Sequence, residues 1–283
     1  MSKIHGITGE KGGVGKSLIA LAIAEQLRKR GDEFVICETD RSNGDVGNAF
    51  DGKREVIRPY FVEDVDQIDQ ADQLLDVALR GVDIVMNTPA QSHRPIAKWL
   101  SLGSADLALS EGVQLYFWFV TSGERDSVNL FIESLQEFQG IPHILIRNEH
   151  FTDRLTYDYS DPNTWPAIKE AVDTYQVPVI TFPRLGPADI DFMKAHALTF
   201  GEALEPTSGL SIGGRSRIFR ALNTLFAQLD ALEVFKTHEP PQPERTTAKR
   251  GRKKRAVKAN SGDDGLNGDA ENGSPISSDG SAG

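Results

Sequence analysis

The sequence predicts an α/β protein with a doubly wound, mostly parallel sheet and helices on both faces, followed by a disordered tail. Short, continuous apolar runs alternate with amphipathic segments over the first 236 residues, and such runs are typical of strands buried on both faces. Beyond residue 236, proline, charged residues, glycine and serine dominate, and they bury too little apolar surface to offset the entropy of ordering. We therefore expect one domain over residues 1–236 and a disordered tail over residues 237–283.

A glycine-rich turn stands between the first predicted strand and the first predicted helix. An apolar run at Ile4 to Ile7 precedes it and a helical pattern from Leu18 to Arg30 follows it. Strand, glycine-rich turn and helix together are the context of a phosphate-binding loop. Glycines let the backbone approach a polyphosphate, and the loop N–H groups and the helix N-terminus attract anions. The residues expected to contact a nucleotide here are Gly12, Gly13, Val14, Gly15, Lys16, Ser17 and Leu18.

Two side chains of this turn carry chemistry. Lys16 is placed to reach the β- and γ-phosphates, and the Ser17 hydroxyl is placed to ligate Mg²⁺. The turn departs from G-x-x-x-x-G-K-[ST] at its first position, where Glu10 stands, and it contains a second lysine, Lys11. In this respect it resembles the ParA/MinD family of deviant-Walker-A ATPases, whose signature lysine stands where Lys11 stands. The resemblance implies a P-loop NTPase fold with ATP and Mg²⁺ as cofactors.

The resemblance also implies a nucleotide-dependent homodimer with an adaptor or cargo protein as a further partner. In the family the signature lysine crosses to the partner protomer's nucleotide, so Lys11 is expected to stabilise charge there. Arg41 or Arg94 could share this role, although an ordinary surface charge is the favoured interpretation of each.

The remaining elements follow in order along the chain. Gly31 ends the first helix, and the stretch 41–52, rich in Gly, Asn and Asp, is predicted to be a loop. Further strands are expected at 34–37, 54–62, 82–87, 114–121, 141–146 and 177–182, and helices at 69–80, 126–138, 165–175 and 215–235. The last helix has one apolar face, and Asp230 and Glu233 on its second half favour core packing over a membrane surface.

Polar residues stand where several of these strands end, the edge at which doubly wound sheets bind ligands. By resemblance, Asp40 is expected to orient the attacking water and contribute to the metal shell, with Glu38 in place of a first acid and Asp45 as the alternative. Asn87 stands where the family carries its metal-shell acid and can accept only from a Mg²⁺-bound water. Further along, the residues expected at the base are Asn148, Pro183 and Arg184.

Charge and composition restrict the partners. The chain has a net charge of −10, with eight Lys/Arg and no acid over 245–258, and five acids and no base in the Gly/Ser-rich end, 259–283. The basic run exceeds the acidic end by three charges, so residues 1–244 carry −13. Non-specific DNA binding is therefore expected only through the run Lys249-Arg250-Gly251-Arg252-Lys253-Lys254-Arg255, whose alternative role is protein binding or solubility. No secretory signal or membrane span is recognisable, which favours a cytoplasmic protein without a membrane partner.

The resemblance to the ParA/MinD family implies an ATP-dependent dimeric switch with slow hydrolysis that positions or segregates DNA or protein cargo, in plasmid partition, stability or conjugative mobilisation. The alternative is a nucleotide-sensing adaptor that binds ATP with little or no hydrolysis, which Asn87 favours. A third class, an iron–sulfur reductase of the same fold, needs a pair of cysteines per subunit, and Cys37 is the single cysteine of the chain.

Overall fold

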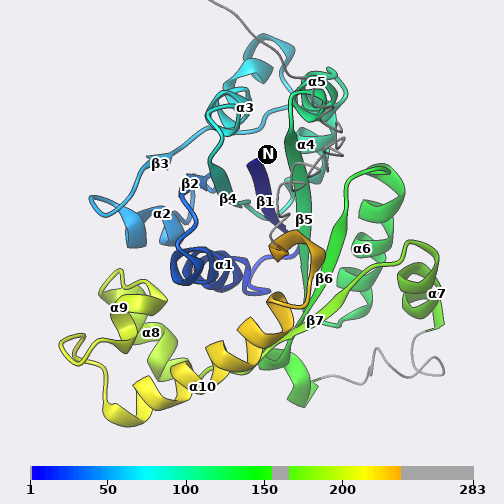
Figure 1. The fold of residues 1–283 in the computed structure, drawn as a ribbon. Coiled ribbons are helices and arrows are strands. Elements are labelled where there is room, and N and C mark those ends of the chain that lie inside the picture. The colour runs from blue at the N-terminus through cyan, green and yellow to red at the C-terminus, as the bar shows by residue number, and fades with distance from the viewer. Residues whose placement is uncertain (1, 155–165, 237–283) are drawn as a thin grey trace, which may run out of the picture. The chain divides into compact units, whose positions relative to one another are not determined.

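A computed structural model describes residues 2–154 and 166–236 of the chain, and its ribbon is drawn in Figure 1. The strands of the described residues form one seven-stranded sheet in the order β3-β2-β4-β1-β5-β6-β7. Every neighbouring pair is parallel, so the expected mostly parallel sheet is parallel throughout. The strands are β1 (Ser2–Thr8), β2 (Phe34–Glu38), β3 (Val56–Ile57), β4 (Asp83–Asn87), β5 (Val113–Thr121), β6 (His143–Asn148) and β7 (Val179–Phe182).

Helices connect these strands and cover both faces of the sheet (Figure 1). The α-helices are α1 (Lys16–Arg30), α2 (Asp45–Phe50), α3 (Gln73–Ala78), α4 (His93–Leu100), α5 (Ser104–Ser110), α6 (Arg125–Glu137), α7 (Pro166–Thr174), α8 (Pro187–Ala195), α9 (Phe200–Leu204) and α10 (Ile212–Leu229). Short 3₁₀ helices are η1 (Val65–Ala71), η2 (Glu149–Arg154) and η3 (Glu233–Phe235).

The core has two sides because successive strand residues point to opposite faces. On one face, Ile7, Ile36 and Val85 pack with residues of α1, α2, α8, α9 and α10. On the other face, Ile4 and Val35 pack with α3, α4 and α5, and the far half of the same face packs with α6 and α7. Two covered faces make the fold doubly wound, as the apolar runs predicted.

The central strand β1 places the glycine-rich turn. β1 pairs with β4 on one side and with β5 on the other, so the chain leaves it where the strand order changes direction. In doubly wound sheets this switch point, at the carboxyl ends of the strands, is where ligands bind. The helix that follows, α1, is rich in Ala, Leu and Ile, and Gly31 ends it with a left-handed φ of 79°.

Several boundaries differ from the predicted ones. The stretch 41–52 is not all loop, because α2 forms within it and packs Val46, Ala49 and Phe50 into the core beside α1. The expected strand 54–62 pairs only at Val56–Ile57, and the expected helix 69–80 is divided between η1 and α3. Helices α4, α5, α8 and α9 were not predicted.

The final helix confirms the prediction of core packing. Its apolar stripe is buried against the sheet and α1, with Ile218, Leu222, Leu225, Phe226 and Leu229 all in the core. No helix in residues 2–154 and 166–236 is long and apolar enough to cross a membrane. The predictions for the tail at 237–283, including its basic run, concern residues outside the described ranges.

Candidate functional site

The glycine-rich turn lines a cavity of about 580 Å³ at the carboxyl ends of the strands. The turn contributes Lys16 and Ser17 to this cavity, the end of β2 contributes Asp40, and the end of β6 contributes Asn148. The remaining walls are Gly12, Gly13, Gly15, Leu18, Ser42, Asn43, Thr88, Pro89, Ala90, His150, Phe151, Phe182, Leu185, Pro187, Ile190, Asp191 and Lys194. The topology therefore brings most of the predicted site residues together.

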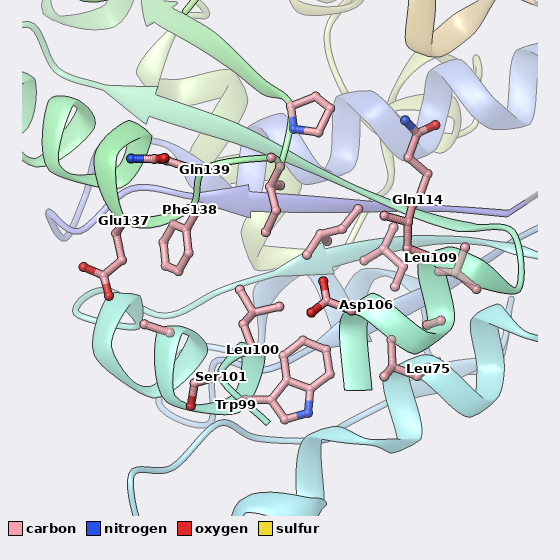
Figure 2. A pocket seen from close by; sticks show the side chains of 18 residues that line it. Leu75, Trp99, Leu100, Ser101, Asp106, Leu109, Gln114, Glu137, Phe138 and Gln139 are labelled. Atoms are coloured by element: carbon pink, nitrogen blue, oxygen red, sulfur yellow. The ribbon is translucent and has the colours of Figure 1, made fainter. Parts of the chain in front are cut away.

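A second cavity, of about 540 Å³, lies near the start of the strands rather than near their ends (Figure 2). Ile4 and Val113 from the beginnings of β1 and β5 line it, together with Trp99, Leu100 and Phe138 from the helices of one face. None of its lining residues belongs to the glycine-rich turn. The cavity at the turn is therefore the candidate site.

The turn has a backbone shape that requires glycine at its end. Gly15 has φ of 100°, a left-handed value, and it caps the N-terminus of α1. A Cβ atom built at Gly15 would lie 2.5 Å from Nδ2 of Asn148. That nitrogen donates to the carbonyl oxygen of Val14 at 2.8 Å, so Asn148 holds the turn from the end of β6, two strands away from β1.

Lys16 is held inside the turn. Its ammonium donates to the carbonyl oxygen of Gly9 at 2.8 Å and to that of Lys11 at 3.3 Å. Burial lowers the pKa of Lys16, and the negative charges of Glu10 and Asp40 oppose that effect. A buried cation satisfied by carbonyl dipoles alone is well suited to an anionic ligand, because a phosphate would supply the full charge that these dipoles lack.

Lys11, the second lysine of the turn, contacts a carboxylate of its own chain. Its ammonium forms an ion pair with Glu124, the residue before α6, and both side chains are about half exposed. Of the alternative cations, Arg41 stacks on the ring of Tyr60, 4.8 Å from its centroid, and Arg94 lies in α4. The role of Lys11 in a partner protomer stays a prediction.

Glu10 has a structural role that explains why glycine is not needed there. Its carboxylate accepts the backbone N–H of His93 at 3.0 Å, and its carbonyl oxygen accepts the N–H of Gln91 at 3.2 Å. Both donors follow β4, Gln91 in the connecting segment and His93 at the first position of α4. Burial raises the pKa of Glu10, and the contact with His93 partly opposes this rise. Glu10 thus ties the turn to the segment that joins β4 to α4.

Asp40 lies in the cavity and organises its own loop. Its Oδ1 accepts from the backbone N–H of Ser42 at 3.0 Å, from the Ser42 hydroxyl at 2.6 Å and from the N–H of Asn43 at 3.1 Å. β4 separates its strand from β1, yet the charge of Asp40 still acts on Lys16. The alternative acid, Asp45, begins α2 and forms an ion pair with Lys194 at 2.8 Å.

Asn87 ends β4 and stands in register with Glu38 of β2. Its Nδ2 donates to Glu38 Oε1 at 3.0 Å, while Glu38 also accepts from the N–H groups of Asp40 and Gly47. Burial raises the pKa of Glu38, and these three hydrogen bonds oppose the rise. The other acid of the strand, Asp83, is at the opposite end of β4 and accepts from the N–H of Lys3. It is remote from the turn.

Of the three residues expected at the base, Asn148 lines the cavity and the other two do not. Asn148 lines the cavity, and besides holding Val14 it accepts the N–H of His150 at 3.0 Å through Oδ1. Pro183 and Arg184 do not line the cavity, although Phe182 and Leu185 on either side of them do. Their contact with a base stays a prediction.

Helix α8 supplies residues that sequence reasoning missed. Ile190, Asp191 and Lys194 line the cavity from this helix. The sequence held one signal for it: Gly186-Pro187 places a proline at the first helical position, where its missing N–H costs nothing. That signal predicts a helix but not which face of the sheet it covers.

The oxygen donors present fit Mg²⁺, which prefers few carboxylates and keeps several waters. The cavity is lined by the Ser17 hydroxyl and the Asp40 carboxylate, and Asn87 Oδ1 is buried without a hydrogen-bond partner. In the part of the chain that the structure describes, no cluster of three His, Cys, Asp or Glu could hold a metal by itself. A magnesium ion here would therefore depend on phosphate oxygens.

The parallel sheet and the glycine-rich turn after its central strand define a protein of the P-loop NTPase fold. No family model matches the chain. Among curated proteins, it is 26% identical over 225 residues to MobD from Acidithiobacillus ferrooxidans, covering 78% of this chain and 93% of MobD. It is 28% identical over 247 residues to TraL from Escherichia coli, covering 83% of this chain and all of TraL.

Solved structures of similar fold include MinD of Pyrococcus horikoshii complexed with Mg-ADP, with a TM-score of 0.48 and 17% identity over 82% of this chain and 97% of MinD. Another is a putative plasmid partition protein of Borrelia burgdorferi bound to AMPPNP, with a TM-score of 0.46 and 16% identity over 81% of this chain and 98% of that protein. The parallel sheet and the glycine-rich turn before α1 agree with the P-loop NTPase fold that the resemblance to the ParA/MinD ATPases implied.

Proposed function

We propose that the protein is an ATP-dependent switch ATPase that dimerises on Mg-ATP and positions or segregates DNA or protein cargo. The observation that carries this proposal is Lys16, a buried ammonium held by loop carbonyls at the N-terminus of an α-helix. The similarity to MobD and TraL fits a role in plasmid mobilisation or transfer, within the wider group that includes plasmid partition and stability.

In this proposal each loop residue has a distinct task. Bound Mg-ATP supplies the phosphoanhydride bond and the cation that neutralises its charge. Lys16 neutralises the β- and γ-phosphates, and Ser17 ligates the metal. Asp40, at the edge of the cavity, orients the water that attacks the γ-phosphate. Lys11 leaves Glu124 and reaches the nucleotide of the partner protomer.

The substitution Lys16→Ala tests the nucleotide site. It should abolish binding of Mg-ATP, because Lys16 is the buried cation held by the carbonyls of the turn, whereas Lys11 pairs with Glu124 and Lys194 pairs with Asp45. Isothermal titration of the full chain measures this directly, with Lys29→Ala, a lysine at the far end of α1, as the matched control. An unchanged affinity in Lys16→Ala contradicts the assignment of the turn as the phosphate site.

A second candidate is a nucleotide-sensing adaptor that binds ATP and hardly hydrolyses it. Asn87 favours it, because an amide at this strand end gives the metal no negative charge. Single-turnover hydrolysis at saturating Mg-ATP separates the two candidates: a measurable first turnover supports the switch, and bound ATP recovered intact supports the adaptor.

We also propose that the basic segment 245–258, with its eight Lys/Arg, binds duplex DNA without sequence preference, since residues 1–244 carry a net charge of −13 and should repel DNA. With about five to eight phosphate contacts, the log–log salt slope should be roughly −4 to −7. A chain ending at Lys236 should lose DNA binding and keep ATP binding, as measured by fluorescence anisotropy over a salt series. Equal DNA affinity in the shortened chain would mean that the DNA surface lies elsewhere.

A further inference from the structure

Glu38 and Asn87 occupy one face of the sheet at the edge where α1 begins. Ile36 and Val85, two residues earlier on β2 and β4, pack in the same core cluster as α1. Because strand side chains alternate, Glu38 and Asn87 point to the face that α1 covers. Ser17, the expected metal ligand, lies in the first turn of α1 on that face. The pair therefore lies on the same face of the sheet as the expected metal ligand.

The hydrogen bond between the two residues determines how the Asn87 amide is oriented. A carboxylate only accepts, so the donor Nδ2 must face Glu38, at 3.0 Å, and Oδ1 must face away from it. Glu38 itself is held by two backbone donors, Gly47 N at 3.0 Å and Asp40 N at 3.1 Å. Two strands and the start of α2 thus hold this carboxylate in place.

The outward-facing Oδ1 has no partner. Asn87 is 1% exposed, and its Oδ1 makes no hydrogen bond within the described residues. Leaving a buried acceptor unsatisfied is unfavourable, so such an atom in a folded protein indicates a ligand that donates to it. A water bound to Mg²⁺ is a strong donor of the right kind.

We propose that Glu38 is a positioning residue for the metal shell, holding Asn87 so that its Oδ1 accepts from a Mg²⁺-bound water. The negative charge that an acid at position 87 would provide is then supplied by Glu38, one strand away, about 4.8 Å across the sheet. This inference rests on the proposed nucleotide function and adds to it the residue that compensates for the amide at Asn87.

The substitution Glu38→Gln tests the inference in the full chain. A glutamine can present its own N–H₂ to Asn87, so the Asn87 amide is no longer held in one orientation. The metal shell also loses the negative charge of Glu38. ATP affinity is measured by isothermal titration with saturating Mg²⁺ and again in EDTA. The gain in affinity that Mg²⁺ confers should fall by about 10–100-fold, the usual cost of removing such a supporting partner, while the affinity in EDTA stays unchanged. Glu111→Gln, at an exposed glutamate after α5, is the matched control.

The double variant Glu38→Gln with Asn87→Asp is the second test, and thermal unfolding verifies that each variant is folded. It moves the carboxylate to position 87 and leaves the introduced glutamine amide at position 38 to donate to it, so most of the lost Mg²⁺ dependence should return. A normal Mg²⁺ dependence in Glu38→Gln, or no recovery in the double variant, overturns the inference. If the unsubstituted chain binds no ATP in either condition, the proposed function is wrong. If it binds with Mg²⁺ dependence and Glu38→Gln does so equally, only the role of Glu38 is wrong.

Discussion

The ammonium of Lys11 contacts the carboxylate of Glu124, the residue immediately before helix α6. The two side chains are 42% and 50% exposed, and ion pairs at such sites contribute about 0–1 kcal/mol because water screens them. The contact therefore holds Lys11 within its own protomer only weakly. The free energy of nucleotide binding could easily offset the loss of this ion pair.

This weak pair predicts unequal effects of its two members. Lys11→Ala should still bind ATP but lose ATP-dependent dimerisation and hydrolysis, since the charge supplied to the partner's nucleotide is gone. Glu124→Ala should dimerise at least as readily as the unsubstituted chain. The protein concentration at which half of the chains are dimeric should shift by no more than about fivefold, the equivalent of about 1 kcal/mol. Analytical sedimentation with and without ATP measures both. If Lys11→Ala dimerises normally, Lys11 is merely a loop charge.

Two glycines of the turn should respond differently to alanine. Gly15→Ala should lower the unfolding free energy by about 1–3 kcal/mol. Gly15 has a left-handed φ of 100°, and the added Cβ would lie only 2.5 Å from Asn148 Nδ2. At Gly12, which has no such φ and no atom within 4 Å of a built Cβ, the change should stay within about 0.5 kcal/mol. Urea denaturation without nucleotide gives both values. Equal values would show that the contact with Asn148 relaxes without cost.

The buried His143 should make stability depend on pH. Its Nε2 lies 3.0 Å from the Ser134 hydroxyl oxygen and its Nδ1 lies 2.8 Å from the Ile141 carbonyl oxygen. Burial lowers the pKa of His143 to about 4 from its usual 6.5. Between these values the unfolded chain binds a proton that the folded chain does not, so the unfolding free energy falls as the pH drops from 6.5 to 4.

The loss attributable to His143 should be about 2–4 kcal/mol, since each pKa unit corresponds to about 1.4 kcal/mol. His143→Gln cannot titrate, so its stability profile should be flatter over this range than that of the unsubstituted chain, whatever its absolute stability. Urea denaturation at intervals between about pH 4 and 8 compares the slopes. Parallel profiles would mean that another group dominates the acid response.

The sequence by itself determined the parts of this protein that depend on neighbours along the chain. The apolar runs predicted the buried strands β1, β2, β4, β5, β6 and β7, because a strand covered on both faces must be continuously apolar. The turn from Glu10 to Ser17 predicted the phosphate loop, because its glycines and its position between strand and helix are local properties. Helix α2 escaped prediction because burial of Val46 and Phe50 outweighs the weak helix propensity of its Gly and Asn.

Only the tertiary structure decided which side chains meet. Glu38 and Asn87 are 49 residues apart and touch because β4 inserts between β1 and β2 in the sheet. The strand order likewise brings β5 beside β1, and the residue before α6, Glu124, meets Lys11. Each of these contacts depends on non-sequential strand pairing, which is set by packing of both faces of the sheet. The pattern of apolar and turn residues along the chain does not specify which strands pair. The sequence therefore predicted the glycine-rich turn but not the residues that hold it.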